Sequence, residues 1–278
     1  MKCGKKICIL LLSSWLLTAC GGSTGGAEES ATENNQVQAS VVDGTEESSG
    51  QEELPEVEVT PVALEVDFSK GQPEGFECAD GWCNGSVFNV TWRKNNVTFQ
   101  DGRMQLMIDK DATPAGNVPY SGGEFRSKDF YGYGRYEVSM KAIKNDGVVS
   151  SFFTYTGPSD NNPWDEIDVE ILGKDTTKVQ FNYYTDGKGE HEYMHELGFD
   201  ASEDFHTYAF EWHEDKIIWF VDGIEVHQAT EKIPVTKGKI MMNAWCGIGV
   251  DEWLKPFDDS KLPLTAQYQW IKYTPFEK

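Results

Sequence analysis

Three acidic residues alternate along one short segment: Glu166, Asp168 and Glu170 lie within the sequence PWDEIDVEILG, residues 163–173. Side chains on a β-strand alternate between its two faces, so these acids share one face and the aliphatic residues between them take the other. Like charges on one face repel one another, which folding alone would not favour. The pattern therefore indicates a chemical use for the cluster.

Glycoside hydrolysis is a reaction that needs such a cluster. A retaining enzyme holds two carboxyl groups about 5–5.5 Å apart, one as nucleophile and one as acid and base. Strand Cα atoms four residues apart are separated by roughly 13 Å, so the side chains of Glu166 and Glu170 must lean inward. We therefore expect a curved sheet with the acids on its concave face. The alternative is a polar strand face exposed to solvent, as in many antiparallel sheets.

The proton chemistry of the cluster fits the same reaction. A neighbouring negative charge raises the pKa of a carboxyl group and keeps it protonated as a general acid. Once the nucleophile is esterified to sugar its charge vanishes, so the pKa of the partner falls. The same partner then acts as a base toward water.

Short runs of β-branched and aromatic residues, divided by Gly, Asn and Asp, occupy the chain from residue 64 onward. These runs alternate or are continuously apolar over five or six residues, as strands do; examples are residues 135–140, 178–183 and 216–221. Asp-Gly pairs are typical of tight turns; they occur at residues 101–102, 186–187 and 222–223. Helical periodicity over ten or more residues is missing. The pattern predicts an all-β, two-sheet antiparallel sandwich.

The net charge excludes some classes of partner. The chain has 24 Lys and Arg against 46 Asp and Glu, a formal net charge of −22. Nucleic-acid binding needs clustered Lys and Arg, and docking on anionic lipid needs a basic surface. A neutral, ring-shaped partner such as a sugar remains compatible with this charge.

The N-terminus resembles an export signal. Residues 1–6 are basic, residues 7–17 are apolar, and the sequence LTAC follows at residues 17–20. The apolar run is too short to span a bilayer comfortably. Residues 1–20 are therefore predicted to be a lipoprotein-type signal peptide with Cys20 as the lipidated residue, the alternative being an ordinary secretory peptide. The lipid would be the only membrane contact of an extracytoplasmic protein.

Residues 21–62 carry ten acids, no base and no aromatic residue, so we expect a disordered acidic linker. The catalytic domain is expected over residues 63–278. Within it, Cys78 and Cys83 lie five residues apart across a Gly turn, and outside the cytoplasm they could either form a small-loop disulfide or remain free. The sequence contains neither a Cys-x-x-Cys pair nor His residues at metal-ligand spacing, so it indicates no metal site.

Several motifs together resemble one enzyme family: WDEIDVE at 164–170, SSFFTYTG at 150–157, GKDTTKVQFNYY at 173–184, FHTYAFEW at 205–212 and KIMMN at 239–243. They are similar to bacterial lichenases, the endo-β-1,3-1,4-glucanases of glycoside hydrolase family 16, over residues 64–275. The resemblance implies a β-jelly-roll sandwich with an open concave substrate cleft, with a monomer as the default expectation.

The resemblance also implies roles for the acids. Glu166 would be the nucleophile, Glu170 the acid and base, and Asp168 a residue that orients both. The regular Glu-x-Asp-x-Glu spacing is associated with mixed-linkage glucanases, whereas laminarinases commonly carry one extra residue. The implied reaction is hydrolysis of β-1,4 bonds adjacent to β-1,3 bonds in lichenan or cereal β-glucan, by double displacement.

Substrate contacts are implied at further positions that match the family. Aromatic faces stack on sugar rings, whereas Asn, Glu and Arg bond to hydroxyl groups. The positions are Asn84, Glu124, Arg126, Phe153, Tyr155, Asn182, Tyr184, Asn243, Trp245 and Trp253. Trp164 is expected to line the cleft beside Glu166. Two other tryptophans, Trp212 and Trp219, are expected in the core.

No cofactor is required by this chemistry. Relatives bind a structural calcium through an Asp near the C-terminus, where this chain has Gln269, so a calcium site is doubtful. Two other functions stay open: a laminarinase-like β-1,3-glucanase that uses the same acids, and a non-catalytic glycan-binding lipoprotein. A binding module has no need of all three acids, which favours the enzyme.

Overall fold

The computed structural model of the protein describes residues 63–116 and 118–276. The expected signal segment with Cys20 and the linker at 21–62 lie outside these residues. Strands dominate, and the only α-helix in the described part is the single turn α1, Asp251–Leu254. No helix among the described residues is long and apolar enough to cross a membrane.

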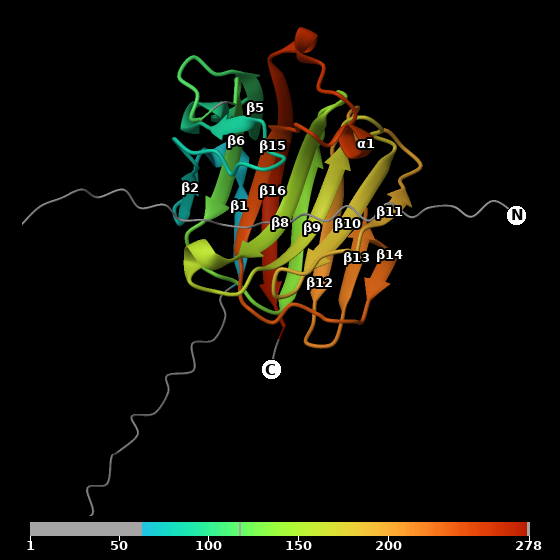
Figure 1. Cartoon of the computed structure of the whole chain (residues 1–278). Helices are drawn as coiled ribbons and strands as arrows, with labels where there is room; N and C mark the ends of the chain where they lie inside the picture. The colour runs from blue at the N-terminus through green and yellow to red at the C-terminus, as the bar shows by residue number, and fades with distance from the viewer. Residues whose placement is uncertain (1–62, 117, 277–278) are drawn as a thin grey trace, which may run out of the picture. The chain divides into compact units, whose positions relative to one another are not determined.

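The strands form two layers joined along one edge, as Figure 1 shows. The sheet that carries the acids, called the inner sheet here, has the order β11 (Tyr193–Glu196), β10 (Lys178–Tyr184), β9 (Asp165–Leu172), β8 (Val148–Thr156), β15 (Lys239–Cys246), β6 (Tyr120–Ser127), with β2 (Phe76–Cys78) also on β6. The outer sheet has the order β5 (Arg103–Lys110), β16 (Leu264–Pro275), β7 (Gly134–Lys141), β12 (His206–Trp212), β13 (Ile217–Val221), β14 (Ile224–Ala229), with β1 (Leu64–Asp67) on β16 and β4 (Val97–Gln100) on β5.

Almost every pairing is antiparallel, so the predicted two-sheet antiparallel sandwich is confirmed. The exception is the short strand β3, Val90–Trp92, which runs parallel to β6. The two layers connect through β5 and β6, which share a short register at Asp109↔Ser121 and Lys110↔Tyr120. The architecture agrees with the jelly-roll that the family resemblance implied.

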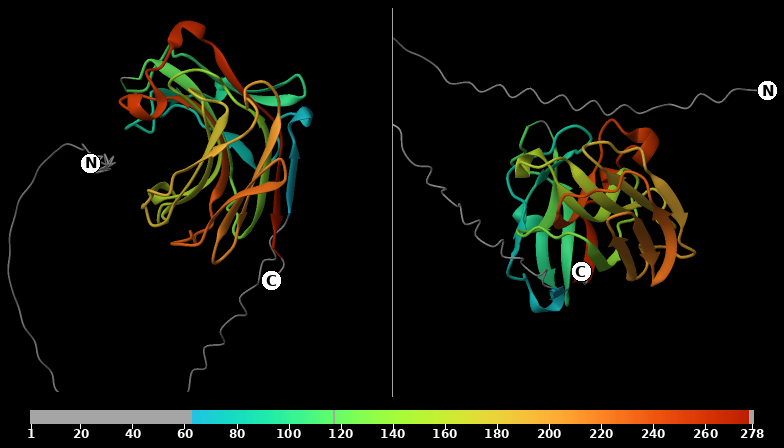
Figure 2. Two further views of the ribbon diagram at one scale, coloured as in Figure 1. Left: turned by 90° about the vertical axis from the view of Figure 1, so that its right-hand side faces the viewer. Right: turned by 90° about the horizontal axis from the view of Figure 1, so that it is seen from below.

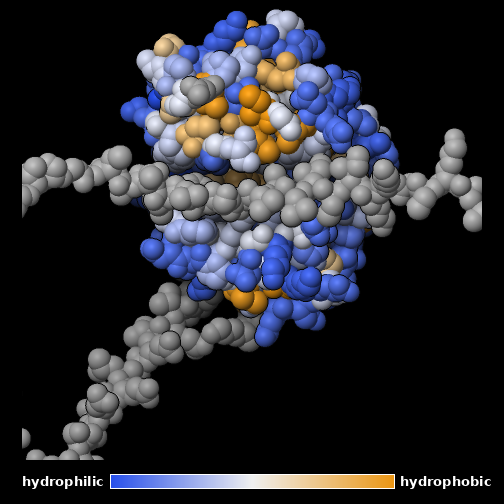
Figure 3. Space-filling model, viewed as in Figure 1, coloured by the Kyte–Doolittle hydropathy of each residue, from blue (hydrophilic) through white to orange (hydrophobic). Residues whose placement is uncertain are grey.

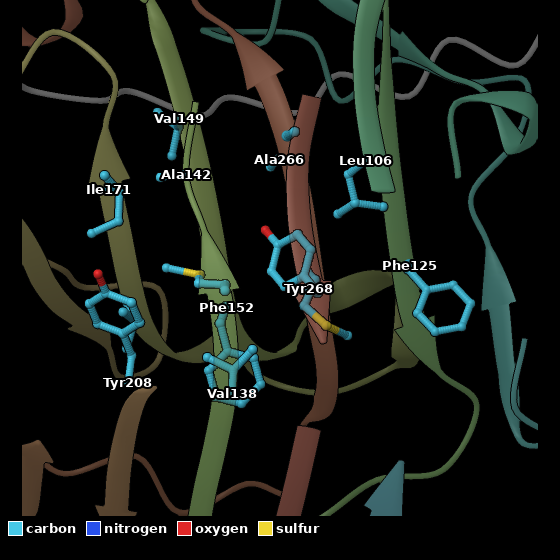
Figure 4. Close-up of a cluster of buried hydrophobic side chains, with 14 of the residues drawn as sticks. Leu106, Phe125, Val138, Ala142, Val149, Phe152, Ile171, Tyr208, Ala266 and Tyr268 are labelled. Carbon is cyan, nitrogen blue, oxygen red and sulfur yellow. The ribbon is translucent and has the colours of Figure 1, made fainter. Parts of the chain in front are cut away.

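The space between the layers is filled by the aliphatic and aromatic faces of the strands. Ile167, Val169 and Ile171 are fully buried, as the alternation on β9 predicts. Figure 4 shows Phe152 and Ile171 of the inner sheet among core side chains of the outer sheet. Trp212 and Trp219 are also buried, which confirms their expected core positions. Each such side chain stabilises the fold by about 1.5–3 kcal/mol relative to an exposed one.

The predicted Asp-Gly turns are all present. Both residues of each pair have positive φ, the requirement of a type I′ turn; the φ values are 54° and 73° at Asp101-Gly102, 51° and 72° at Asp186-Gly187, and 48° and 79° at Asp222-Gly223. The first connects β4 to β5, and the last connects β13 to β14. Tight turns of this kind fix the register of the strands that they join.

The inner sheet is curved, and its concave side faces away from the outer sheet, as the left view of Figure 2 shows. Because Ile167 and Val169 point toward the outer sheet, Glu166, Asp168 and Glu170 point to the concave side. The curvature expected from the spacing of the acids is therefore observed.

The Cys78–Cys83 disulfide is not formed, which resolves the two alternatives in favour of free thiols. Cys78 ends β2 and pairs with Phe125 of β6. Cys83 lies in the following loop, where its Sγ accepts from Gly85 N at 3.2 Å and lies 3.6 Å from the carbonyl oxygen of Phe88. Cys78 is thus held by the pairing of β2 with β6, whereas Cys83 is held by hydrogen bonds within its own loop.

Candidate active site

The acids of β9 lie between two strands that present side chains to the same concave face. On β8, the register places Tyr155 opposite Glu166 and Phe153 opposite Asp168. On β10, it places Tyr184 opposite Glu166 and Asn182 opposite Asp168, so polar and aromatic groups flank the acids on both sides. Four of the residues that the sequence singled out are thereby brought next to the acids.

Glu166 receives a hydrogen bond from the indole of Trp164. Trp164 Nε1 donates to Glu166 Oε2 at 2.5 Å, because residues 164 and 166 project from the same face at the start of β9. The indole is stacked on the ring of Tyr184, with centroids 4.6 Å apart and planes 11° apart. The indole therefore has a fixed orientation as a donor to one carboxyl group.

Glu170 is held by a different donor. Gln180 Nε2 donates to Glu170 Oε2 at 2.8 Å across the β9–β10 pair. Trp253 of α1 donates from Nε1 to Gln180 Oε1 at 3.1 Å, so the amide is itself oriented. The two glutamates of the cluster thus sit in separate hydrogen-bond networks.

Burial raises the pKa of all three acids. The pKa of Glu166 rises to about 7, against the opposing effect of hydrogen bonds from Trp164 and Asp168. The pKa of Glu170 rises to about 8, because the charge of Glu166 adds to burial and the bond from Gln180 only partly offsets them. Burial and the charges of both glutamates raise the pKa of Asp168 well above its usual value. The cluster as a whole therefore keeps protons to a higher pH than free carboxyl groups do.

Asp168 lies between the two glutamates and has little contact with solvent, being 5% exposed. Its high pKa keeps it protonated, so it can donate to the carboxylate of Glu166. Trp219 of the outer sheet donates from Nε1 to the backbone oxygen of Asp168 at 3.2 Å and ties this position to the core.

A second polar group lies further along the concave face, on β6 and β15. Asn243 is opposite Ser151 of β8 and Glu124 of β6. Ser151 Oγ donates to Asn243 Oδ1 at 2.6 Å, and Asn243 Nδ2 lies 3.4 Å from Glu124 Oε2. Burial raises the pKa of Glu124 to about 7, although the charge of Arg126 opposes the rise. This group offers both donors and acceptors to hydroxyl groups.

The concave face ends at the loop after β2. The guanidinium of Arg126 lies 5.0 Å from the ring of Trp82, which is 36% exposed, and Arg126 Nε donates to Glu77 Oε1 at 2.9 Å. Asn84 in the same loop accepts from Trp92 Nε1 at 2.9 Å. An open aromatic ring beside Arg126 is suited to stacking on a sugar.

Two predicted contact residues, Asn182 and Trp245, are both buried but have different neighbours. Asn182 is 4% exposed, and its Oδ1 has no hydrogen-bond partner among the described residues, so it is an unused acceptor opposite Asp168. Trp245 is also 4% exposed and packs on Phe88 at 4.2 Å and Trp253 at 6.0 Å. Trp245 shares the face of Asn243 on β15, and its ring is largely covered by these two contacts.

Sequence reasoning missed four residues of this face. Gln180 and Ser151 each stand two positions before a predicted contact residue on the same strand, and the period of two would have found them. Trp82 stands two positions before Asn84 and was not singled out. The charge of Glu192 raises the pKa values of Asp168, Glu170 and Tyr184, but Glu192 precedes β11 outside any motif.

The arrangement is suited to acid, base and nucleophilic chemistry on a neutral ligand rich in hydroxyl groups. Among the described residues no group of three or more His, Cys, Asp and Glu side chains is placed to hold a metal ion. Figure 3 views the molecule from the concave side and shows apolar residues gathered in its upper half, with hydrophilic residues around and below them. Carbohydrates present both kinds of surface, C–H faces and hydroxyl edges.

Comparison with known proteins places these residues in a family. The sequence profile of Glycosyl hydrolases family 16 matches residues 84–272. A beta-glucanase of Acetivibrio thermocellus is 61% identical over 208 residues, 75% of this chain and 61% of its own length. A xylanase/beta-glucanase of Ruminococcus flavefaciens is 58% identical over 218 residues, 77% of this chain but 27% of its own length. The chain thus spans less than two thirds of these relatives.

Solved structures agree. A lichenase derived from a mouse hindgut metagenome is 55% identical, with a TM-score of 0.74, and the match covers 77% of this chain and 99% of that one. The beta-glucanase of Bacillus licheniformis is 52% identical, with a TM-score of 0.73 over 78% of this chain and 100% of that one. The laminarinase domain of Thermotoga maritima shares the fold at 22% identity, with a TM-score of 0.67 over 77% of this chain and 98% of that one.

Proposed function

Because the chain belongs to glycosyl hydrolases family 16, we propose that it is a retaining endo-glucanase that cuts β-1,4 bonds adjacent to β-1,3 bonds in mixed-linkage β-glucans. The observation that carries the proposal is the pair Glu166 and Glu170. They share the concave face of one strand, are held by different donors, and differ in proton affinity. Two carboxyl groups of unequal pKa are what a double displacement requires.

In the first step Glu170 donates its proton to the glycosidic oxygen while the carboxylate of Glu166 attacks the anomeric carbon. The bond between that carbon and the leaving oxygen breaks, and an ester forms between the sugar and Glu166. Asp168 donates a hydrogen bond to the carboxylate of Glu166. The indole of Trp164 donates to Oε2 of the same carboxylate and so fixes its orientation.

In the second step Glu170, now ionised, takes a proton from water, and the resulting hydroxide attacks the same carbon. The ester bond breaks, and Glu166 leaves as a carboxylate. The ester has removed the charge of Glu166 that raised the pKa of Glu170, so Glu170 becomes acidic enough to be the base at this stage. Two inversions give net retention of the anomeric configuration.

The substrate class rests on two observations. The acids have the regular Glu-x-Asp-x-Glu spacing, without the extra residue associated with laminarinases. The relatives named above are called beta-glucanase and xylanase/beta-glucanase, and one similar structure is a β-1,3-1,4-glucanase. Glu124, Asn182 and Asn243 supply the hydroxyl contacts, while Tyr155, Trp82 and Tyr184 supply ring faces. The chemistry uses side chains of this chain alone.

A structural calcium is not part of this proposal. Gln269 occupies the position where relatives are expected to carry a calcium-binding Asp. Its Oε1 accepts a hydrogen bond from Ser139 Oγ at 2.9 Å, and its amide carries no negative charge. A hard cation prefers carboxylate oxygens, so this side chain fits such a site poorly. We further propose an extracytoplasmic monomer anchored through lipidated Cys20; the N-terminal sequence supports the anchor, and metabolic labelling with palmitate would test it.

The experiment that tests the function is proton NMR of the purified chain acting on barley mixed-linkage β-glucan, with laminarin in parallel. Depolymerisation of the barley glucan with the β-anomer appearing first is the expected result. Cleavage of laminarin alone would make the protein a β-1,3-glucanase. No cleavage of either would favour a glycan-binding role, and an α-anomer formed first would overturn the double displacement.

A further inference from the structure

The carboxylate of Asp165 is buried at the start of β9 and accepts three backbone hydrogen bonds. Its Oδ1 accepts from Asp186 N at 2.9 Å, and its Oδ2 accepts from Val235 N at 3.0 Å and Thr236 N at 2.9 Å. Asp165 is 4% exposed, and no Lys, Arg or His nitrogen of the described residues lies within 4 Å of it. The hydrogen bonds that this buried carboxyl group accepts therefore all come from backbone N–H groups.

The donors come from two segments remote in sequence. Asp186 belongs to the Asp-Gly turn that follows β10, and Val235 and Thr236 belong to the loop at 230–238 between β14 and β15. That loop is fixed independently of Asp165, because Pro234 O accepts from Trp212 Nε1 at 2.8 Å and Glu231 O accepts from Tyr183 Oη at 2.7 Å. Asp165 thus joins β9 to two pieces of chain that are already anchored.

The same unit encloses Trp164, the residue before Asp165. Gly187 N donates to Trp164 O at 2.8 Å, and a Cβ on Gly187 would lie 3.6 Å from the indole ring. The turn therefore covers one side of the indole, while the ring of Tyr184 is stacked on it. Because residues 164 and 165 project from opposite faces, Asp165 is held on the side away from Glu166 and contacts neither Glu166 nor the concave face.

We propose that Asp165 is a positioning residue of the active site: its carboxylate locks the start of β9, the 186–187 turn and the 235–236 backbone into one unit, which fixes the Trp164 indole as the hydrogen-bond donor to Glu166. This inference rests on the proposed role of Glu166 as nucleophile. The coupling runs through covalent and hydrogen bonds: carboxylate to turn, turn to the Trp164 backbone and ring, and indole to Glu166.

The inference gives Asp165 a specific effect on pH dependence. The bond from Trp164 lowers the pKa of Glu166 against the effect of burial. An indole that is no longer held donates less well, so the pKa of Glu166 rises and less nucleophile is ionised at a given pH. The acidic limb of kcat/KM then moves to higher pH, because the protonation of Glu166 is the step that changes.

The test is the variant Asp165→Asn, assayed as the full chain on mixed-linkage β-glucan from pH 5 to 9. An amide cannot accept at both positions, so at least one of the three N–H groups loses its partner. The expected result is an acidic limb shifted upward by about half to one pH unit, and therefore kcat/KM lowered about 3- to 10-fold at pH 6 but less at pH 8.

Trp164→Phe removes the indole donor and should give the same upward shift. Adding Asp165→Asn to Trp164→Phe should then produce no further shift, because both act through one bond. Val235→Pro is a milder second variant: it removes a single N–H donor at a residue that is 65% exposed and leaves the carboxylate in place. It keeps the test available where Asp165→Asn folds poorly.

Asp200→Asn is the matched control. Asp200 accepts from Ser202 N at 3.0 Å and from Thr176 Oγ1 at 2.5 Å, outside the acid cluster, so this variant should lower the thermal midpoint and leave the acidic limb unchanged. An active wild-type enzyme whose acidic limb does not move in Asp165→Asn or in Val235→Pro would overturn the inference. A wild-type chain that does not cut the glucan, or gives the α-anomer first, would instead overturn the proposed function.

Discussion

Two groups of acids on opposite faces of the molecule differ in their partners. On the inner sheet, Glu166, Asp168 and Glu170 face one another and neutral donors, and no cation pairs with them among the described residues. On the outer sheet, Arg135 bridges two acids, with Nε 3.1 Å from Glu137 Oε1 and Nη1 3.0 Å from Glu211 Oε1.

The difference separates structure from chemistry. A cation between two carboxylates removes their repulsion, and Arg135 also lies 4.4 Å from the ring of Phe220, so the outer group stabilises the junction of β7, β12 and β13. The inner group keeps its repulsion and its burial, which raise the pKa values of the acids. That destabilising arrangement sets the protonation states that hydrolysis needs.

Removing the nucleophile should give the largest change. Glu166→Ala is expected to lower kcat by about 10⁴-fold or more, because the ester to the sugar cannot form. Added azide should restore turnover with an α-glycosyl azide as product, whereas Glu170→Ala with azide should give the β-product. Product configuration is read by proton NMR, and the reverse pattern would exchange the two roles.

The unequal pKa values predict a narrow pH optimum. A glutamate that must be ionised, with pKa about 7, and one that must be protonated, with pKa about 8, give a bell-shaped kcat/KM with limbs near those values. The limbs belong to the coupled group as a whole. Gln180→Ala removes the bond that lowers the pKa of Glu170, so the basic limb should move upward. A basic limb that moves downward would contradict the assignment of Glu170 as the acid.

Neutralising one acid should stabilise the fold in a pH-dependent way. The pKa of the Glu170 carboxyl group is higher in the folded than in the unfolded state. The group therefore lowers the free energy of unfolding progressively as pH rises between the two pKa values, here from about 4.5 to about 8. Glu170→Gln should therefore match the wild type at pH 4 and melt on the order of 10 °C higher at pH 8. Calorimetry at both pH values measures this, and an equal difference at both would rule out proton linkage.

The outer group should respond in the opposite manner. Arg135→Met removes the bridge between Glu137 and Glu211 and should lower the free energy of unfolding by about 1 kcal/mol, since the group is partly exposed. kcat/KM should stay within about twofold, because the group lies on the other sheet. A large loss of activity in a folded variant would mean that the two sheets communicate.

Local patterns predicted much of this molecule. The alternation on β9 gave the direction of the acids, and the Asp-Gly pairs gave three turns, because both depend on residues close in sequence. The sandwich also followed from strand length and spacing. The network around Asp165 could not be predicted, since its donors lie 21, 70 and 71 positions away and only the folded chain brings them together.

Burial was the other quantity that the sequence left open. Trp245 was predicted to face the substrate; it shares a face of β15 with Asn243, but the extent to which Phe88 and Trp253 cover its ring depends on segments outside β15. The spacing of Cys78 and Cys83 left a disulfide and free thiols equally open, and in the fold both thiols are free while β2 pairs with β6 at Cys78. Gln180 was visible in principle, because it shares a face with Asn182.

Among the described residues the sheet order ends at β11 and β14, each of which has a neighbouring strand on one side only. Such edges are templates for pairing with another molecule and hence for aggregation. Both are short, of four and six residues, and carry acids such as Glu196 and Glu225. With a net charge of −22, copies of the chain repel one another at these edges near neutral pH. We expect colloidal stability to fall in acid or high salt, where that repulsion is neutralised or screened.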